Sequence, residues 1–168
     1  MARTRTRGFT LVELMVTIVV LAVLVSMAIP SFDYVKLSNR LNSYSTDLVA
    51  GSQVARSEAI KRNTQVTLCV SSNGTSCATT GQWETGWIVI SADGAVIQKQ
   101  PATASGYQIR DSTGLSALAF EATGVGATAA NFTICRSSPL GSLERVVKVS
   151  ATGRSSITRT STGVCAAT

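Results

Sequence analysis

The feature that most constrains this chain is an apolar segment at residues 9–29, which contains 21 residues and one formal charge, Glu13. At about 1.5 Å rise per residue, a helix of this length covers the roughly 30 Å hydrocarbon core of a bilayer. Arg3, Arg5 and Arg7 precede the segment, and no comparable basic cluster directly follows it. The positive-inside rule therefore predicts a single-pass membrane protein with a cytoplasmic N-terminus and a C-terminal domain on the other side.

A cleaved secretory signal peptide is the alternative interpretation, because Ser26-Met27-Ala28 could serve as a small-x-small cleavage site. The apolar core of such a peptide usually has about 7 to 15 residues. The segment here is longer, which favours the anchor.

Glu13 is unusual because a lone carboxylate costs a few kcal/mol at the bilayer centre and usually marks a function. Near a helix start the macrodipole stabilises it, and a new amine at Phe9 of a neighbouring subunit would supply the opposite charge. Alternatively, the side chain simply reaches the lipid headgroups.

Residues 7–14 read Arg7-Gly8-Phe9-Thr10-Leu11-Val12-Glu13-Leu14. With the basic leader and an apolar helix that ends at Pro30, this segment resembles the class III signal of type IV prepilins. The resemblance implies that a prepilin peptidase cleaves between Gly8 and Phe9 in the inner membrane and methylates Phe9. It also implies that Glu13 pairs with a neighbouring N-terminus during assembly and that the helix kinks near Pro30, because proline removes a helical hydrogen bond.

Apolar residues continue at helical spacing beyond Pro30, while polar residues occupy the other faces. The apolar positions are Leu37, Leu41, Tyr44, Leu48, Ala55 and Ala59. We therefore expect a leader at residues 1–8, a transmembrane helix at 9–30 and its amphipathic continuation at 31–62, followed by a periplasmic β-rich domain at 63–168.

Short β-rich runs separated by turn residues follow the helix and predict one antiparallel sheet on which it packs. The expected strands are 65–71, 87–91, 95–100, 107–110, 117–121, 131–135, 146–150 and 155–159. Asp93-Gly94 and Thr152-Gly153 are candidate hairpin turns. The predicted fold class is α+β.

Four cysteines lie beyond the apolar segment, without the CxxC spacing or histidines of a zinc site. Disulfides in an oxidising compartment fit this pattern best. We pair Cys69 with Cys77 and Cys135 with Cys165 by proximity in the sequence, although four cysteines permit three connectivities. Free buried thiols are the alternative.

Residues 69–77 form a short cysteine-bounded loop, followed by Trp83 and then by Trp87 at the start of an apolar strand. This pattern resembles the minor pilins FimT and FimU and the GspH pseudopilins, with a type IV pilin-like fold. The tryptophans themselves are most simply core residues. The resemblance implies a minor pilin that primes or caps a type IV pilus and whose partners are other major and minor pilins or pseudopilins. A minor pseudopilin of a type II secretion system is the alternative, and an ordinary single-pass periplasmic protein, which would not be cleaved at Gly8, is a further one.

The net charge of +6 includes three leader arginines, so +3 remains if the leader is removed. Five basic residues against one acid, Glu144, fall within the last 33 positions, and such a patch attracts polyanions. These candidates for binding double-stranded DNA are Arg154 and Arg159, helped by Lys148, Arg145 and Arg136. Gly153-Arg154 is similar to the Gly-Arg-x-Arg element that binds DNA in FimT-type proteins, but Ser156 replaces its second arginine.

The chain contains no histidine, which excludes His-based triads and His-ligated metals, and it has no phosphate-binding GxxxxGK[ST] run. We therefore expect no enzymatic activity, no cofactor, no metal site and no small-molecule substrate.

Overall fold

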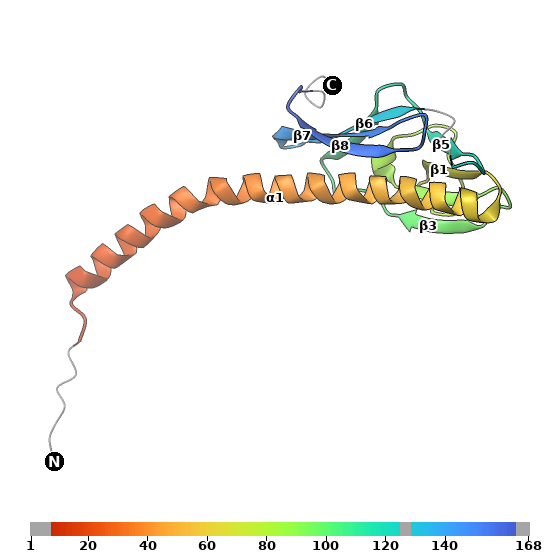
Figure 1. Ribbon diagram of the computed structural model, residues 1–168. Helices are drawn as coiled ribbons and strands as arrows, with labels where there is room; N and C mark the ends of the chain where they lie inside the picture. Colours follow the sequence, from red (N-terminus) through yellow and green to blue (C-terminus); the bar gives the residue numbers. More distant parts are fainter. Residues whose placement is uncertain (1–7, 125–128, 164–168) are drawn as a thin grey trace, which may run out of the picture. The chain divides into compact units, whose positions relative to one another are not determined.

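The computed structural model describes residues 8–124 and 129–163, apart from the side chains at 27–31. The chain divides into two compact units, the first ending at Lys36 and the second beginning at Leu37. One helix, α1, spans Leu11–Arg62 and contributes to both units (Figure 1). The assigned helix continues through position 30, and the expected kink there stays a prediction.

Within the described ranges, eight strands follow α1, at the positions that the sequence pattern predicts. Their bounds are β1 Val66–Val70, β2 Trp87–Ser91, β3 Val96–Gln100, β4 Tyr107–Asp111, β5 Ala117–Phe120, β6 Ala130–Ser137, β7 Leu140–Val149 and β8 Ser155–Thr160. A short 3-10 helix, η1 at Trp83–Thr85, precedes β2. The largest difference is β7, which begins at Leu140 rather than at Val146 because it forms a long hairpin with β6.

The strands form two antiparallel sheets, so the expectation of a single sheet was wrong. One sheet has the order β3-β2-β1-β5 and the other the order β4-β6-β7-β8. The chain leaves the first sheet after β3, adds β4 to the second, and returns for β5, which pairs with β1. Alternation of apolar and polar residues reports that a segment is a strand, but it carries no information about which strand lies beside it.

The second half of α1 shares one hydrophobic core with both sheets, and Figure 1 shows their strands alongside this half. Its contacting face is the predicted stripe: Leu37, Leu41, Leu48, Ala55 and Ala59 are buried and Tyr44 is partly buried. Ser45 and Ser52 are also fully buried. Their hydroxyls tolerate burial because each donates to the carbonyl four residues earlier and so has a hydrogen-bond partner.

Both predicted glycine turns are present. Gly94 has φ of +84° between β2 and β3, and Gly153 has φ of +72° between β7 and β8. Glycine suits both positions because it has no Cβ to clash in the left-handed region.

Candidate functional site

The predicted cleavage site lies in an exposed stretch just before α1. Gly8 has open space around its Cα, and Phe9 is 83% exposed. A peptidase requires an accessible peptide bond, and this stretch offers one. Cleavage between Gly8 and Phe9, and methylation of Phe9, stay predictions.

Glu13 has a local partner that the sequence reading missed. The Thr10 backbone N–H donates to Glu13 Oε2 over 3.4 Å, and the Glu13 backbone N–H donates to Thr10 Oγ1 over 3.2 Å. This reciprocal pair is a capping box, whose sequence signature, threonine followed three residues later by glutamate, is readable in advance. Both bonds are longer than the usual 2.9–3.0 Å, so the carboxylate can exchange this partner for a stronger one.

The first half of α1 exposes large apolar side chains on all of its faces. Those from Leu11 to Val25 are 49% to 74% exposed. Contiguous apolar surface of this kind marks a protein or membrane interaction site. Within the residues that the structure describes, which leave out the side chains at 27–31, no helix is both long and apolar enough to cross a membrane. The transmembrane placement of residues 9–30 stays a prediction.

The first predicted disulfide is confirmed. Cys69 and Cys77 are bonded, with their Cα atoms 5.5 Å apart, and the intervening loop is held by Asn73, which accepts from the backbone N–H groups of Thr75 and Ser76. Cys135 is also disulfide-bonded, but its predicted partner, Cys165, lies outside the described residues. The second pairing therefore stays a prediction.

Both tryptophans are core residues, as we expect. Trp83 Nε1 donates to the Leu115 carbonyl over 2.7 Å, and its ring packs edge to face on Phe132 with centroids 4.8 Å apart. Trp87 packs on α1 at Gly51, where an added Cβ would lie 2.5 Å from the indole ring.

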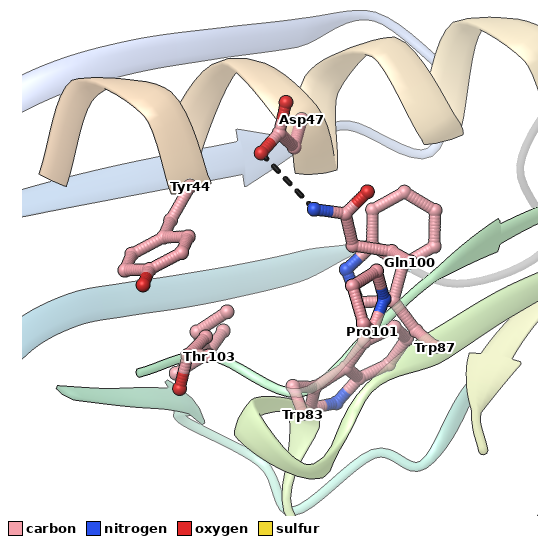
Figure 2. Close-up of a pocket in the computed structure, with 8 residues that line it drawn as sticks. Tyr44, Asp47, Trp83, Trp87, Gln100, Pro101 and Thr103 are labelled. Atoms are coloured by element: carbon pink, nitrogen blue, oxygen red, sulfur yellow. Dashed lines mark hydrogen bonds between the residues drawn. The ribbon is translucent and has the colours of Figure 1, made fainter. Parts of the chain in front are cut away.

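Figure 2 shows the cavity beside these rings, with Gln100 Nε2 donating to Asp47 Oδ2 over 3.1 Å. The cavity volume is about 10 Å³, which is at most the space of one water molecule. It is therefore a packing defect and not a ligand site.

Two of the five candidate DNA-binding residues are buried, which corrects their assignment. Arg145 is 1% exposed, and Arg136 is 9% exposed. The Arg145 guanidinium donates to Asn42 Oδ1 over 2.8 Å, to Ser38 Oγ over 3.1 Å and to the Glu144 carbonyl over 3.0 Å. A spacing of basic residues does not show which face of a strand each side chain occupies, and here the β7 pleat turns Arg145 toward α1.

The three exposed candidates do not share one surface. Lys148 and Arg154 line an open groove of about 500 Å³ beside the β7–β8 turn. Arg159 is paired with Arg145 across β7 and β8, so the two lie on the same face, whereas Lys148 is three residues along β7 and lies on the opposite face.

Arg56, which the sequence reading missed, lies beside the same turn. Its Cδ is 3.3 Å from the position that a Cβ on Gly153 would occupy, and Gly153 also abuts the Gly124 carbonyl. The turn that carries Arg154 is therefore packed onto α1 rather than free. Only the tertiary structure brings Arg56, which is 97 positions from Gly153 in the chain, into this basic region.

Among the described residues, no cluster of His, Cys, Asp and Glu side chains could hold a metal ion.

Two family models match the chain. The model of the type II transport protein GspH matches residues 45–153, and the prokaryotic N-terminal methylation motif matches residues 3–29. The motif implies a prepilin anchored in the inner membrane. No curated protein matches the chain.

Three solved structures share the fold. The type IV minor pilin FimU of Pseudomonas aeruginosa is 24% identical, with a TM-score of 0.57 over 72% of this chain and 90% of that one. A second crystal form of FimU gives 23% identity and a TM-score of 0.55 over 70% and 92%. The minor pseudopilin EpsH of the Vibrio cholerae type 2 secretion system is 12% identical, with a TM-score of 0.53 over 71% and 96%.

The long helix packed on antiparallel sheets is thus a type IV pilin-like α+β fold, and the protein is a structural, non-enzymatic subunit whose partners are other pilins and the prepilin peptidase. Because the GspH model matches more than half of this chain and the methylation motif matches its first residues, the chain belongs to the GspH family of minor pilins and pseudopilins.

Proposed function

We propose that this protein is a minor pilin of a type IV pilus, which inserts its N-terminal helix into the fibre and displays its disulfide-bonded domain to prime or cap it. One observation supports this proposal above all: α1 exposes apolar residues around its first half while a single carboxylate, Glu13, stands at its start with only weak local bonds. Such a helix gains from burial among similar helices, where each apolar side chain removed from water contributes about 1.5–3 kcal/mol.

The assembly contact follows from charge. Cleavage after Gly8 creates an amine at Phe9, and the Glu13 carboxylate of a neighbouring copy or relative supplies the opposite charge. In an apolar fibre core each charge would be costly alone, and pairing offsets this cost. Orientation follows from the leader arginines, which hold the N-terminus in the cytoplasm.

A pair of substitutions at Glu13 tests the assembly contact. Glu13→Gln keeps an oxygen that can accept from the Thr10 N–H but removes the charge, whereas Glu13→Asp keeps the charge on a shorter side chain. We expect Glu13→Gln to be processed yet to fall at least tenfold in sheared fibres, measured by immunoblot, with Glu13→Asp retaining part of the parent level. Glu121→Gln, in the globular domain, is the control. Parent-level incorporation of Glu13→Gln would contradict the proposal.

Processing is tested separately by mass spectrometry of the native protein. We expect an N-terminus at Phe9 that carries one methyl group. A mature protein that retains the leader would exclude both fibre interpretations and would favour an ordinary membrane-anchored periplasmic protein.

A minor pseudopilin of a type II secretion system is the second candidate, and the matched GspH model favours it. Deletion of the gene separates the two interpretations. Loss of surface pili with normal protein secretion supports the pilus, whereas loss of secretion with normal piliation supports the secretion system.

DNA capture is an additional role within the pilus interpretation, and the groove that Lys148 and Arg154 line supports it. Binding to double-stranded DNA should fall steeply with salt through counterion release. In gel shifts at low salt, we expect Lys148→Ala and Arg154→Ala to weaken binding several-fold. Arg159→Ala, on the opposite face of the sheet from Lys148, should have a smaller effect. No shift at low salt, or equal effects of all three substitutions, would count against this groove.

A further inference from the structure

The apolar stripe of α1 does not by itself define where the helix lies along the sheets. Its buried members Leu37, Leu41, Leu48, Ala55 and Ala59 recur at intervals of four and seven residues. Apolar burial is non-directional, and a helix displaced by one turn or two would present a similar row of side chains. Some other contact must select one axial position.

Arg145 on β7 supplies a directional contact of the kind required. The residue is 1% exposed, and its guanidinium donates to Asn42 Oδ1 and Ser38 Oγ. These two acceptors are four residues apart, so they lie on one face of α1 and are separated by one turn. The planar guanidinium has a fixed fork of donors, and it matches acceptors only at defined positions.

Gly51 and Trp87 form a second position-specific contact on the other sheet. Gly51 is the only glycine in α1, and a Cβ at that position would lie 2.5 Å from the Trp87 ring. An axial shift of α1 would place a side chain where the indole ring now lies.

We propose that Arg145 is a positioning residue. Together with the Gly51–Trp87 contact, it selects the axial register of α1 on the globular domain. Buried polar groups act as register devices in other helical assemblies, where they specify one alignment at a cost in stability. The consequence for assembly rests on the proposed function: the register determines how many residues of α1 separate Glu13 from the domain, and hence where the domain lies when Glu13 is paired in a fibre.

Disulfide trapping in the full-length protein in detergent measures the register directly. In the native register, a Cβ at Gly141 would lie 2.9 Å from Leu37 Cδ2, so the pair Leu37→Cys and Gly141→Cys reports this alignment. The pair Leu41→Cys and Gly141→Cys reports a shift of one turn. With Arg145 present, we expect the first pair to cross-link at least fivefold more than the second under mild oxidation.

Arg145→Met is the informative background because a buried ionic or polar group can often be replaced by a hydrophobic residue without loss of stability. We expect Arg145→Met to retain cooperative unfolding and to reduce the preference for the first pair to less than twofold. An unchanged fivefold preference would overturn the proposal. If Arg145→Met does not unfold cooperatively, the milder variant Ser38→Ala, which removes one acceptor, is tested instead. An unchanged fivefold preference in that variant would likewise overturn the proposal.

Fibre incorporation provides the second readout. We expect Arg145→Met to be processed normally and to enter fibres several-fold less than the parent, with Lys148→Met, on the other face of β7, as the matched control. Equal incorporation of both variants would overturn the functional consequence. If the unsubstituted protein does not enter any fibre, the proposed function is contradicted. The cross-linking result then still tests, by itself, whether Arg145 selects the register of α1.

Discussion

At the residue scale, two turn glycines are informative because they share a left-handed backbone but differ in their surroundings. Gly153 has φ of +72°, and a Cβ there would lie 2.9 Å from the Gly124 carbonyl oxygen. Gly94 has a similar φ of +84° but open space around its Cα. The two glycines therefore separate the cost of a left-handed backbone from the cost of a close contact.

Gly153→Ala should lower the free energy of unfolding by more than Gly94→Ala. The left-handed conformation costs a non-glycine residue about 1–2 kcal/mol at either position. At Gly153 the clash with the Gly124 carbonyl adds to this cost. Denaturant titration of both variants measures the difference, and equal losses would contradict the contact.

Trp83→Phe tests the partly buried indole hydrogen bond. Loss of the Nε1–H donor leaves the partly buried Leu115 carbonyl without this partner. A fully buried unsatisfied acceptor costs about 1–3 kcal/mol, and solvent access here brings the cost to the lower end of that range. We expect a loss of this size in the free energy of unfolding. Because the phenyl ring also reduces the volume, Trp83→Leu serves as a comparison that removes both the donor and the edge-to-face contact with Phe132, and it should cost more.

At the element scale, tight hairpins join the edge strands β3 and β8 to their sheets, and a short disulfide loop follows the interior strand β1. The turn between β2 and β3 depends on Asp93, whose carboxylate accepts from the Ser91 hydroxyl and the Ala95 backbone N–H. These bonds hold the pKa of the exposed Asp93 carboxyl below its ordinary value of 3.8. A carboxyl group whose pKa is lower in the folded state than in the unfolded chain stabilises the folded state at pH values above its unfolded pKa. This contribution disappears as the pH falls through the folded-state pKa.

Asp93→Asn should therefore reduce the dependence of stability on pH below about pH 4, because asparagine keeps an acceptor oxygen but does not titrate. The parent should lose stability on acidification over this range by more than the variant does. Thermal unfolding at pH 7 and at pH 3 measures both. Identical acid sensitivity of the two proteins would show that Asp93 makes no contribution.

Replacement of Cys69 and Cys77 by serine should lower the free energy of unfolding by about 2.5 kcal/mol, from the entropy of closing a loop with a sequence separation of 8. The hydrogen bonds of Asn73 within the loop remain possible, so we expect the domain still to fold. Denaturation under oxidising conditions measures the loss, and a change of less than about 0.5 kcal/mol would contradict a stabilising role.

At the scale of the whole molecule, the second unit contains the entire buried hydrophobic core found among the described residues. The first buried core residue is Leu37, where this unit begins. Among the described side chains, exposed apolar ones concentrate before it, from Phe9 to Val25 and from Phe32 to Val35. The buried core and the exposed apolar part of α1 are therefore separate stretches of the sequence.

A fragment that begins at Lys36 should consequently fold cooperatively and remain monomeric without detergent, as judged by circular dichroism and size-exclusion chromatography. A fragment that begins at Ser43 lacks Leu37, Leu41 and the two acceptors of Arg145, and it should be less stable by several kcal/mol, since each buried leucine contributes about 2–5 kcal/mol. Equal stability of the two fragments would exclude an energetic role for the start of the second unit.

Local sequence patterns predicted much of this protein because they report local physics. The amphipathic stripe of α1, all eight strands and the Cys69–Cys77 pair follow from hydrophobic period, turn residues and short cysteine spacing, whereas the N-terminal segment was identified by its resemblance to prepilin signals. Even the overlooked capping box of Thr10 and Glu13 was readable, since its residues are three apart.

Only the tertiary structure decided which strands are neighbours and which basic residues are buried. The order β3-β2-β1-β5 and the burial of Arg145 against Asn42, 103 positions away, depend on contacts between distant segments. A local pattern determines that a side chain alternates between two faces of a strand, but the packing of the rest of the chain determines which face meets the helix and which meets solvent. The sequence alone therefore determined the elements and the N-terminal methylation motif, and the fold decided which strands pair and which basic side chains stay exposed.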